Sequence, residues 1–358
     1  MKRWQWPLVF TFCAVMGEAV AASSDSNKVV IAHRGASGYL PEHTLAAKAM
    51  AHAQGAHFLE QDLVMTKDSH VVVLHDLTLN AISDVAVTFP DRARPDGKHY
   101  VIDFTLAELR QLDVNERRDA RGEPLYPGRF KRQQVPFGIH TLNEEIQLIQ
   151  GLNRTTGRKA GLYAEIKAPA FHHEEGYDLA RAALEILQSH GYTTRDDGVV
   201  IQSFDALELQ RIKSQLLPEL GLDLPLTQLL ADPNWGASIG SPSDKGWQSS
   251  DAAAVAAYAD ALGVPISMLF EPVAAHALSP QSPENPLDLS QVIVPTALVK
   301  QAKAQGLTTH AFTLRADQLP LNQGALKDWH HWLFEKAQVD GLFVDFPDLT
   351  VQYLEQAP

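Results

Sequence analysis

The stretch that decides the fold runs from Ile31 to Asp76 and reads IAHRGASGYLPEHTLAAKAMAHAQGAHFLEQDLVMTKDSHVVVLHD. The β-branched run at 29–32 predicts a buried strand that ends at His33. Thr44 is placed to cap a helix, and residues 58–65 predict the next strand. Strand, helix and strand in this order imply a right-handed parallel crossover.

The second strand is followed almost at once by another apolar run. Only residues 66–70 separate it from the run at 71–74, whereas a parallel return needs roughly a dozen residues or more. The two runs are therefore predicted to form a hairpin, which brings His75 opposite Gln61. Because side chains alternate between the faces of a strand, Glu60 and Asp62 share one face beside this histidine.

Further strand candidates recur along the rest of the chain, and most are followed by helical stretches such as 179–187, 207–216 and 296–305. With the first two strands they make about eight strand–helix units, the pattern of a closed (β/α)₈ TIM barrel. The candidates are 161–166, 199–203, 226–230, 262–268, 308–313 and 341–346.

The segment at 77–137, directly after the His75 strand, breaks this pattern. It is charged and turn-rich, and its one short helix candidate is 106–112. A stretch this long without strand–helix units indicates a small inserted subdomain rather than barrel core. The barrel pattern resumes with a helix that begins after Thr141.

The N-terminus has the features of a secretory signal peptide. Lys2 and Arg3 precede an apolar run at 6–17, and small residues follow Glu18. A transmembrane anchor needs roughly 20 apolar residues, and Glu18 ends this run too early. We therefore expect residues 1–22 to be removed, leaving 23–358 without a membrane anchor. The single cysteine, Cys13, goes with them, so no disulfide is expected.

The formal charge of the chain is -13. A surface of this sign repels polyanions, which disfavours nucleic acid or an anionic membrane as a partner. A small phosphodiester remains an acceptable ligand if a cation or a local Arg or Lys offsets its charge.

Three carboxylates are candidate metal ligands. Glu60 and Asp62 lie on one strand face between apolar flanks, and Glu165 lies near the end of a later strand. Charged residues in alternation usually form a solvated face, but here an inward face is costly unless a cation neutralises it. Oxygen ligands without a nearby thiolate favour Ca²⁺ or Mg²⁺ over zinc.

His33 and His75 are the candidates for acid–base catalysis because an imidazole titrates near neutral pH and both flank apolar strands. Asp76 either orients His75 or forms a turn. Other histidines, at 52, 57, 70 and 190, occur in helical or turn contexts and are expected to be exposed.

Cationic and aromatic side chains complete the candidate site. Arg34 offers a planar fork of donors suited to a phosphate and is a candidate for both catalysis and binding. Lys167 shares a strand face with Glu165, and Phe204 and Phe312 follow or end strands where a barrel places its active site. We expect these four side chains to bind substrate.

Several motifs together resemble the glycerophosphodiester phosphodiesterase family, and the signal peptide and insertion resemble its periplasmic members. The resemblance implies a (β/α)₈ barrel with an inserted subdomain, two catalytic histidines (His33 and His75) and a divalent cation, usually Ca²⁺, on Glu60, Asp62 and Glu165. His43 stands where the family more often has Asn, and we assign it no role. The motifs are His33-Arg34-Gly35, Pro41-Glu42-His43-Thr44, Glu60-x-Asp62, Thr66-Lys67-Asp68, Val72-Val73-Leu74-His75-Asp76, His140-Thr141-Leu142-x-Glu144-Glu145, Glu165-Ile166-Lys167 and 340–348.

The expected reaction is metal-dependent hydrolysis of a glycerophosphodiester to sn-glycerol 3-phosphate and an alcohol. One histidine would deprotonate the nucleophile, either water or the glycerol 2-hydroxyl, and the other would protonate the leaving group. A periplasmic glycerol-phosphate binding protein without turnover is the alternative and predicts two lobes with a hinge. A barrel glycosidase using Glu60, Asp62 and Glu165 is a third reading, but it leaves Arg34 and both histidines unexplained.

Overall fold

The computed structural model describes residues 28–131, 135–236, 240–271 and 293–356. The signal peptide expected at 1–22 lies outside these residues. Within the described part, no helix is both long and apolar enough to cross a membrane.

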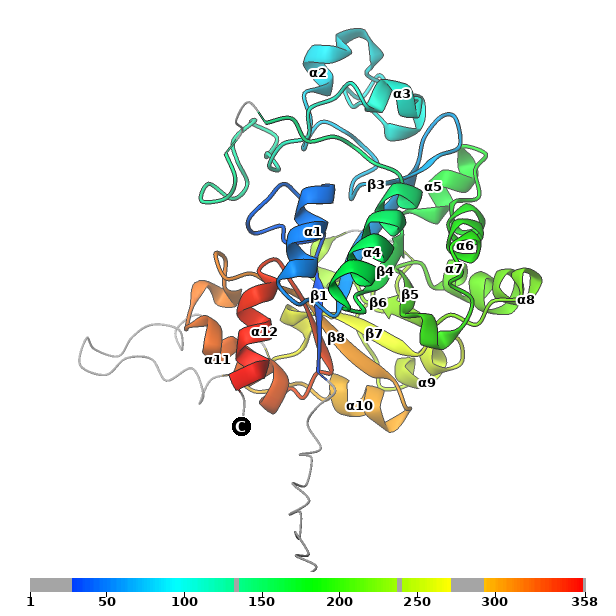
Figure 1. Cartoon of the computed structure of the whole chain (residues 1–358). Helices are drawn as coiled ribbons and strands as arrows, with labels where there is room; N and C mark the ends of the chain where they lie inside the picture. The colour runs from blue at the N-terminus through cyan, green and yellow to red at the C-terminus, as the bar shows by residue number, and fades with distance from the viewer. Residues whose placement is uncertain (1–27, 132–134, 237–239, 272–292, 357–358) are drawn as a thin grey trace, which may run out of the picture.

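Eight parallel strands close into a barrel, as predicted (Figure 1). β1 pairs on one side with β2, through Ile31 and Phe58, and on the other with β9, through Val29 and Gly341, which joins the two ends of the sheet. The barrel strands are β1 (Val29–Ala32), β2 (Phe58–Met65), β4 (Gly161–Ile166), β5 (Val199–Ser203), β6 (Leu226–Leu229), β7 (Ala261–Pro265), β8 (Thr308–Leu314) and β9 (Gly341–Val344).

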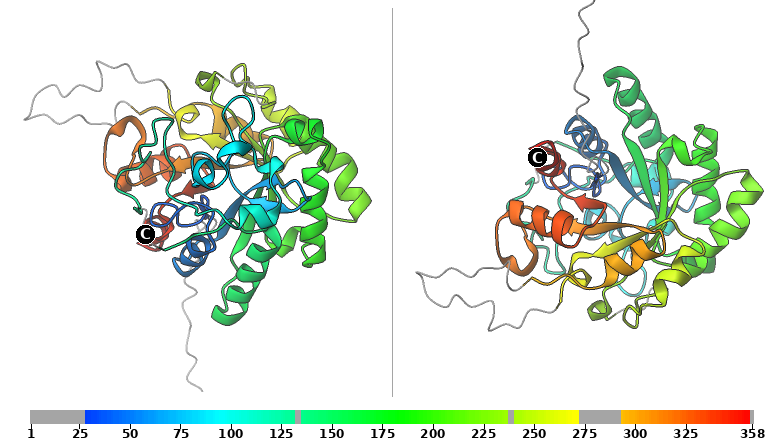
Figure 2. Two further views of the ribbon diagram at one scale, coloured as in Figure 1. Left: turned by 90° about the horizontal axis from the view of Figure 1, so that it is seen from above. Right: turned by 90° about the horizontal axis from the view of Figure 1, so that it is seen from below.

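Helices enclose the strands, as the view from below in Figure 2 shows. Thr44 caps α1 by accepting a hydrogen bond from the amide of Ala47, and Thr141 caps α4 in the same way through Glu144. The helices are α1 (Leu45–Ala53), α4 (Leu142–Thr156), α5 (Pro169–Glu174), α6 (Leu179–Ser189), α7 (Ala206–Arg211), α8 (Leu217–Leu220), α9 (Asp251–Ala256), α10 (Leu298–Ala304), α11 (Leu326–His331) and α12 (Pro347–Gln356).

Two strands end two or more residues earlier than predicted. β7 stops at Pro265, because proline has no amide hydrogen with which to continue the ladder, and Ile266–Met268 forms a 3₁₀ turn. β9 stops at Val344, so that Asp345 leaves the sheet before Pro347 begins α12. Both early ends place loop residues at the rim of the barrel.

The predicted hairpin is present and extends beyond the barrel. β2 pairs with β1 near its start and with the antiparallel strand β3 (Val71–Val73) near its end, where Leu63 faces Val73. The ladder ends with the amide of Leu74, which donates to the carbonyl of Asp62 at 2.8 Å. His75 therefore follows the hairpin at the carboxyl end of the barrel.

The inserted segment, residues 77–137, lies above that end of the barrel in Figure 1. It holds the short helices α2 (Val85–Thr88) and α3 (Leu106–Leu109), and α3 is shorter than the helix predicted at 106–112. Its apolar side chains, with Phe104 and Leu109 fully buried, form a cluster separate from the main core and join β2 and β3 through Val64 and Val72.

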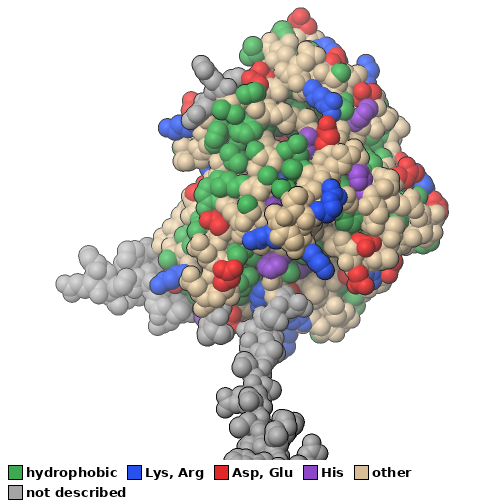
Figure 3. All heavy atoms as spheres, in the orientation of Figure 1, with side chains coloured by type: hydrophobic (Ala, Val, Ile, Leu, Met, Phe, Trp, Pro, Cys, Tyr) green, Lys and Arg blue, Asp and Glu red, His purple; other side chains and the backbone are tan. Residues whose placement is uncertain are grey.

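Charges on the face drawn in Figure 3 are mixed rather than segregated. Lys and Arg alternate there with Asp and Glu, and hydrophobic side chains gather in one band. The net negative charge of the chain is thus not concentrated in a single patch on this face.

A buried ionic network holds α1, β2 and α4 together. The fully buried ammonium of Lys48 lies 2.9 Å from Glu145 Oε1 and also donates to the carbonyl of Glu60. Glu145 accepts further hydrogen bonds from Gln61 at 2.8 Å and from His140 at 2.6 Å. Burial alone would raise the pKa of Glu145, but Lys48 and His140 lower it to about 2. The carboxyl group of Glu145 therefore stays ionised, and its contacts with Lys48 and Gln61 help to fix the strand that carries Glu60.

We expect Lys48→Ala to lower the free energy of unfolding by about 3–5 kcal/mol, because it leaves the Glu145 carboxylate buried without its cation. Denaturant unfolding measures this, with the exposed Lys159→Ala as a control that changes stability by less than about 0.5 kcal/mol. Equal stability of the two variants would contradict a structural role for the network.

One prediction about histidines was wrong. His52 was expected to be exposed, but it is buried between α1 and α4, where its Nε2 lies 2.9 Å from Asn153 Oδ1. The small side chains of α1 let the two helices approach closely, and this encloses the ring.

Candidate active site

The predicted site residues converge on one cavity of about 1040 Å³ at the carboxyl end of the barrel. Its described lining includes every residue that the sequence singled out, namely His33, Arg34, Glu60, Asp62, His75, Glu165, Lys167, Phe204 and Phe312. In the described part, no lining residue of this cavity comes from the inserted segment.

Three carboxylates form the floor of the cavity. Asp62 on β2 is directly paired with Glu165 on β4, and Glu60 precedes Asp62 on the same face. Each of the three offers an oxygen atom within 4.8 Å of the others, and all three side chains are buried. Strand register therefore brings together residues that lie a hundred positions apart.

The charges on this floor are poorly balanced. Burial and the neighbouring Asp62 raise the pKa of Glu60 well above its usual value, and burial raises the pKa of Glu165 to about 8. Burial also opposes ionisation of Asp62, but Lys167 and His75 hold its pKa well below the usual range.

These carboxylates fit a divalent cation. Asp62 Oδ1 is buried and has no hydrogen-bond partner, so one hard oxygen atom is left free for a ligand. Lys167 lies 2.9 Å from Glu165 but 3.7 Å from Asp62, and it offsets only part of the negative charge. The group can therefore hold a metal ion, and an all-oxygen donor set suits Ca²⁺ or Mg²⁺.

The loop after β1 directs Arg34 toward the carboxylates. Its amide donates to Glu60 Oε2 at 2.6 Å, and its guanidinium lies 3.6 Å from Asp62 and 3.0 Å from Glu42. Gly35 follows with φ +88°, and any side chain there would meet the backbone of Ala47 at 2.8 Å. The glycine is therefore required for this turn.

His33 is held by a carboxylate from the far end of the chain. Its Nδ1 lies 2.7 Å from Asp345 Oδ1, in the loop after β9. Burial opposes ionisation of Asp345, but Arg315, His33 and Arg129 keep its pKa well below the usual value. Burial, with a contribution from Arg34, lowers the pKa of His33 to about 4. The ring is thus neutral at pH 7 and leaves Nε2 for chemistry.

His75 has a parallel arrangement. Its Nδ1 lies 2.5 Å from Oδ1 of the adjacent Asp76, so the orienting role left open for this aspartate is the one that the geometry favours. Burial, Arg34 and Lys167 lower the pKa of His75 to about 3. Two histidines, each with Nδ1 on a carboxylate, therefore line the same cavity.

His43, to which the sequence assigned no role, lies against the carboxylates. Its Nε2 is 2.7 Å from Asp62 Oδ2, and the ring is buried. Its backbone has φ +55°, in the left-handed region that asparagine tolerates well. His43 therefore fixes the orientation of Asp62.

Aromatic side chains form one wall of the cavity. Phe204 and Phe312 pack edge to face with ring centroids 6.1 Å apart, and Trp235 lies 6.2 Å from Phe204. Trp235 is 51% exposed, which places it at the mouth. The sequence did not single it out, because it lies in a Gly- and Ser-rich loop without a strand end.

The sequence also missed the arginines behind the histidines. Arg315 lies 3.0 Å from Asp345 Oδ2, and Arg117 and Arg129 of the inserted segment reach Asp76 and Asp345. The only signal in the sequence was charge, which these residues share with many surface arginines.

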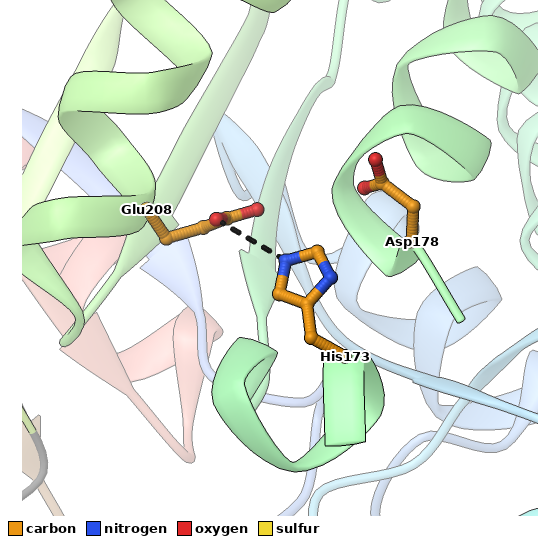
Figure 4. A group of neighbouring side chains, drawn as sticks. All are labelled: His173, Asp178 and Glu208. Carbon is orange, nitrogen blue, oxygen red and sulfur yellow. Dashed lines mark ion pairs between the residues drawn. The ribbon is translucent and has the colours of Figure 1, made fainter. Parts of the chain in front are cut away.

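A second group with metal-ligand chemistry has a different explanation. Figure 4 shows His173 between the carboxylates of Asp178 and Glu208, 3.6 Å from the latter. Arg211 donates to both carboxylates at 2.6 to 3.0 Å, and Asp178 also caps α6. We interpret this group as an ion-pair network that fastens α5, α6 and α7.

The chain is similar to known proteins over most of its length. The model of the glycerophosphoryl diester phosphodiesterase family matches residues 33–349. The chain belongs to this family. A glycerophosphodiester phosphodiesterase of Haemophilus influenzae is 42% identical over 342 residues, which cover 92% of this chain and 90% of the relative. One of Treponema pallidum is 36% identical over 364 residues, covering 96% and 98%.

Solved structures share the fold. A family structure from Silicibacter pomeroyi aligns with a TM-score of 0.63 and 25% identity over 92% of this chain and 93% of that one. A phosphodiesterase of Oleispira antarctica, solved with the product sn-glycerol-3-phosphate, aligns with a TM-score of 0.57 and 22% identity over 92% and 97%.

Proposed function

We propose that this chain hydrolyses glycerophosphodiesters to sn-glycerol 3-phosphate and an alcohol, with His33 and His75 as acid and base. The observation that carries the proposal is the pair of His–Asp contacts on one cavity that also holds Arg34 and three carboxylates. The activity named for the two relatives at 42% and 36% identity supports the same reaction.

The histidines divide the proton transfers. Each Nδ1 is held by an aspartate, so Nε2 is the atom that exchanges a proton with the substrate. One ring takes a proton from the nucleophile, water or the glycerol 2-hydroxyl, and the other gives a proton to the leaving alkoxide. The aspartates keep the rings in the productive tautomer.

The cationic side chains bind the phosphodiester. Arg34 is held by Glu42 and lies beside Asp62. Its guanidinium therefore presents a fixed fork of N–H donors at the cavity wall. Lys167 adds a second positive charge above Glu165. A divalent cation on Glu60, Asp62 and Glu165, Ca²⁺ by our proposal, would supply the additional positive charge that a phosphorane-like transition state requires.

The aromatic wall faces the organic part of the substrate. Phe204, Phe312 and Trp235 offer an apolar surface on one side of the cavity, opposite in character to the carboxylate floor. We propose that it contacts the glycerol carbons or the alcohol group. We further propose that the mature chain, 23–358, acts in the periplasm after removal of its signal peptide.

The alternatives fit less well. A binding protein was expected to have two lobes with a hinge, whereas the described residues form one closed barrel. The glycosidase reading requires two carboxyl groups about 5 Å or more apart with the sugar between them. It also gives no role to His33 and His75, whose Nδ1 atoms are each held by an aspartate and which line the same cavity.

Turnover is the experiment that tests the proposal. The purified chain, supplied with Ca²⁺, is incubated with glycerophosphocholine, and sn-glycerol 3-phosphate is measured with glycerol-3-phosphate dehydrogenase. We expect steady release of this product. Saturable binding of glycerophosphocholine without any product would instead support the binding protein.

A further inference from the structure

We propose that the inserted segment, residues 77–137, positions both catalytic histidines through two arginines, the half-buried Arg117 and the buried Arg129. The inference rests on the proposed function, since it assigns these arginines to the proton-transfer groups. The insertion thereby becomes part of the catalytic machinery, although it contributes no described residue to the lining of the main cavity.

The first connection runs to His75. Arg117 Nη1 donates to Asp76 Oδ2 at 2.6 Å, while Asp76 Oδ1 lies 2.5 Å from His75 Nδ1. The other edge of the same guanidinium donates to both oxygens of Glu42, at 2.6 and 3.0 Å. Glu42 also accepts from Arg34, so one arginine of the insertion links His75 to the phosphate-binding side chain.

The second connection runs to His33. Arg129 Nη2 donates to Asp345 Oδ2 at 2.6 Å, and Asp345 Oδ1 lies 2.7 Å from His33 Nδ1. Arg129 also makes a two-pronged contact with Asp317, at 2.7 and 3.0 Å, and donates to the carbonyl of Ser37 at 3.2 Å. The insertion is thereby tied to the loops after β1, β8 and β9.

Burial and packing indicate built contacts rather than chance surface pairs. The Arg129 side chain is 4% exposed, and its guanidinium stacks 3.7 Å from the ring centroid of Tyr126. Arg117 is 15% exposed. A charge-assisted pair that is shielded from water holds its geometry far better than an exposed one. The planar fork of arginine can bind a carboxylate through two parallel N–H donors, which the single ammonium of a lysine cannot do.

Both connections meet in a small pocket of about 170 Å³ behind the histidines. Its lining includes His33, His75, Arg117 and Arg129, with Tyr126 on the side of the insertion. The insertion therefore lines a pocket that also borders both histidines. Without Arg117, Asp76 Oδ2 would lose the arginine that donates to it, and without Arg129, Asp345 Oδ2 would keep only the ion pair with Arg315 at 3.0 Å.

The same segment supplies matched controls. Arg118, adjacent to Arg117, donates to the carbonyl of Gly122 within the insertion. Arg121 is 83% exposed and pairs with the nearby Asp119. Removing either charge tests the loss of an arginine from this segment without touching a histidine–aspartate pair.

The experiment measures kcat and KM of Arg117→Gln and Arg129→Gln on glycerophosphocholine and on a glycerophosphodiester of p-nitrophenol. We expect kcat on glycerophosphocholine to fall about 10- to 100-fold in each, by analogy with the loss that follows removal of a partner that orients a metal-binding histidine. KM should change less than about threefold in Arg129→Gln, whereas in Arg117→Gln it should also rise, because Glu42, which holds Arg34, loses the same arginine. Arg118→Gln and Arg121→Gln should match the wild type.

The leaving group separates positioning from a merely structural role. p-Nitrophenolate departs without protonation, so the variant that disturbs the acid should lose much less kcat on that substrate than on glycerophosphocholine. The variant that disturbs the base should lose the same factor on both. Equal losses on both substrates in both variants, or kcat falling only with the folded fraction, would overturn the inference.

Two further comparisons keep the outcome interpretable. Arg117→Lys and Arg129→Lys retain the charge but not the fork, and they should recover part of the lost kcat. They replace the glutamine variants if those unfold. If the wild-type protein releases no product, the proposed function itself is contradicted. If the wild-type protein is active and both arginine variants keep its kcat, only this inference is contradicted.

Discussion

We expect His33→Ala and His75→Ala each to lower kcat for glycerophosphocholine by about 10²- to 10⁴-fold, the contribution usual for a positioned acid or base. Both rings line the cavity, and both have Nδ1 engaged by a carboxylate, so the lost group in each case is Nε2. Initial-rate assays at saturating substrate measure the change. The double variant should lose little more than the worse single variant, because the two groups act in one reaction.

The chain offers a matched control for this test. His70 lies in the β2–β3 turn with its side chain 47% exposed, close in sequence to His75 but away from the cavity. His70→Ala should therefore keep the wild-type kcat. Activity within a factor of about three of the wild type in His33→Ala or His75→Ala would refute the paired-histidine mechanism.

We expect removal of the metal to abolish turnover and to lower the thermal stability of the protein. Chelation with EDTA followed by gel filtration should reduce product release to background, and Ca²⁺ or Mg²⁺ should restore it. Ca²⁺ at 100 times its Kd would add about 2.7 kcal/mol to the free energy of unfolding. A higher Tm in calorimetry would report this gain independently of activity.

The rise in Tm that Ca²⁺ produces should depend on pH, and the direction of this dependence follows from the pKa of Glu165. Burial raises the pKa of Glu165 in the folded chain to about 8 from a usual 4.5, so the metal-free folded state keeps a proton that the unfolded chain has released. Stability of the metal-free protein therefore falls as pH rises through this window. Because a cation competes with that proton, the rise in Tm should be larger at pH 8 than at pH 5.

Substitution separates this site from adventitious binding. Asp62→Asn removes a charge from an oxygen that has no hydrogen-bond partner, and it should abolish the Ca²⁺-dependent rise in Tm. Glu208→Gln, in the other acidic group, should leave the rise unchanged. A Tm gain that survives Asp62→Asn would place the metal elsewhere.

Much of the scaffold could be predicted because local patterns determine it. The short apolar runs at β1, β2, β4 and β5 match their predicted bounds, and the short connection after β2 dictated the hairpin. Register then brought Asp62 beside Glu165, as a parallel barrel requires. The ends of two strands were less predictable. β7 stops at Pro265, which has no amide hydrogen, and β9 stops before Asp345, which turns out of the sheet to reach His33.

The second layer of the site could not be predicted, since it depends on contacts between distant segments. Arg129 and Asp345 lie 216 positions apart, and nothing near Arg129 distinguishes it from the exposed Arg121. Asp76 was ambiguous because its role depends on where β3 ends. His52 was mistaken for an exposed residue because a helix face becomes buried only when its neighbour is placed.

The measurement that tests the central proposal most directly is ³¹P NMR of glycerophosphocholine incubated with the Ca²⁺-loaded protein. We expect the diester signal to be replaced by that of sn-glycerol 3-phosphate, with free choline as the other product, and conversion at least about 10²-fold slower with the His33→Ala, His75→Ala double variant. Formation of phosphocholine and glycerol, or a diester signal that persists with the wild type, would contradict the proposal.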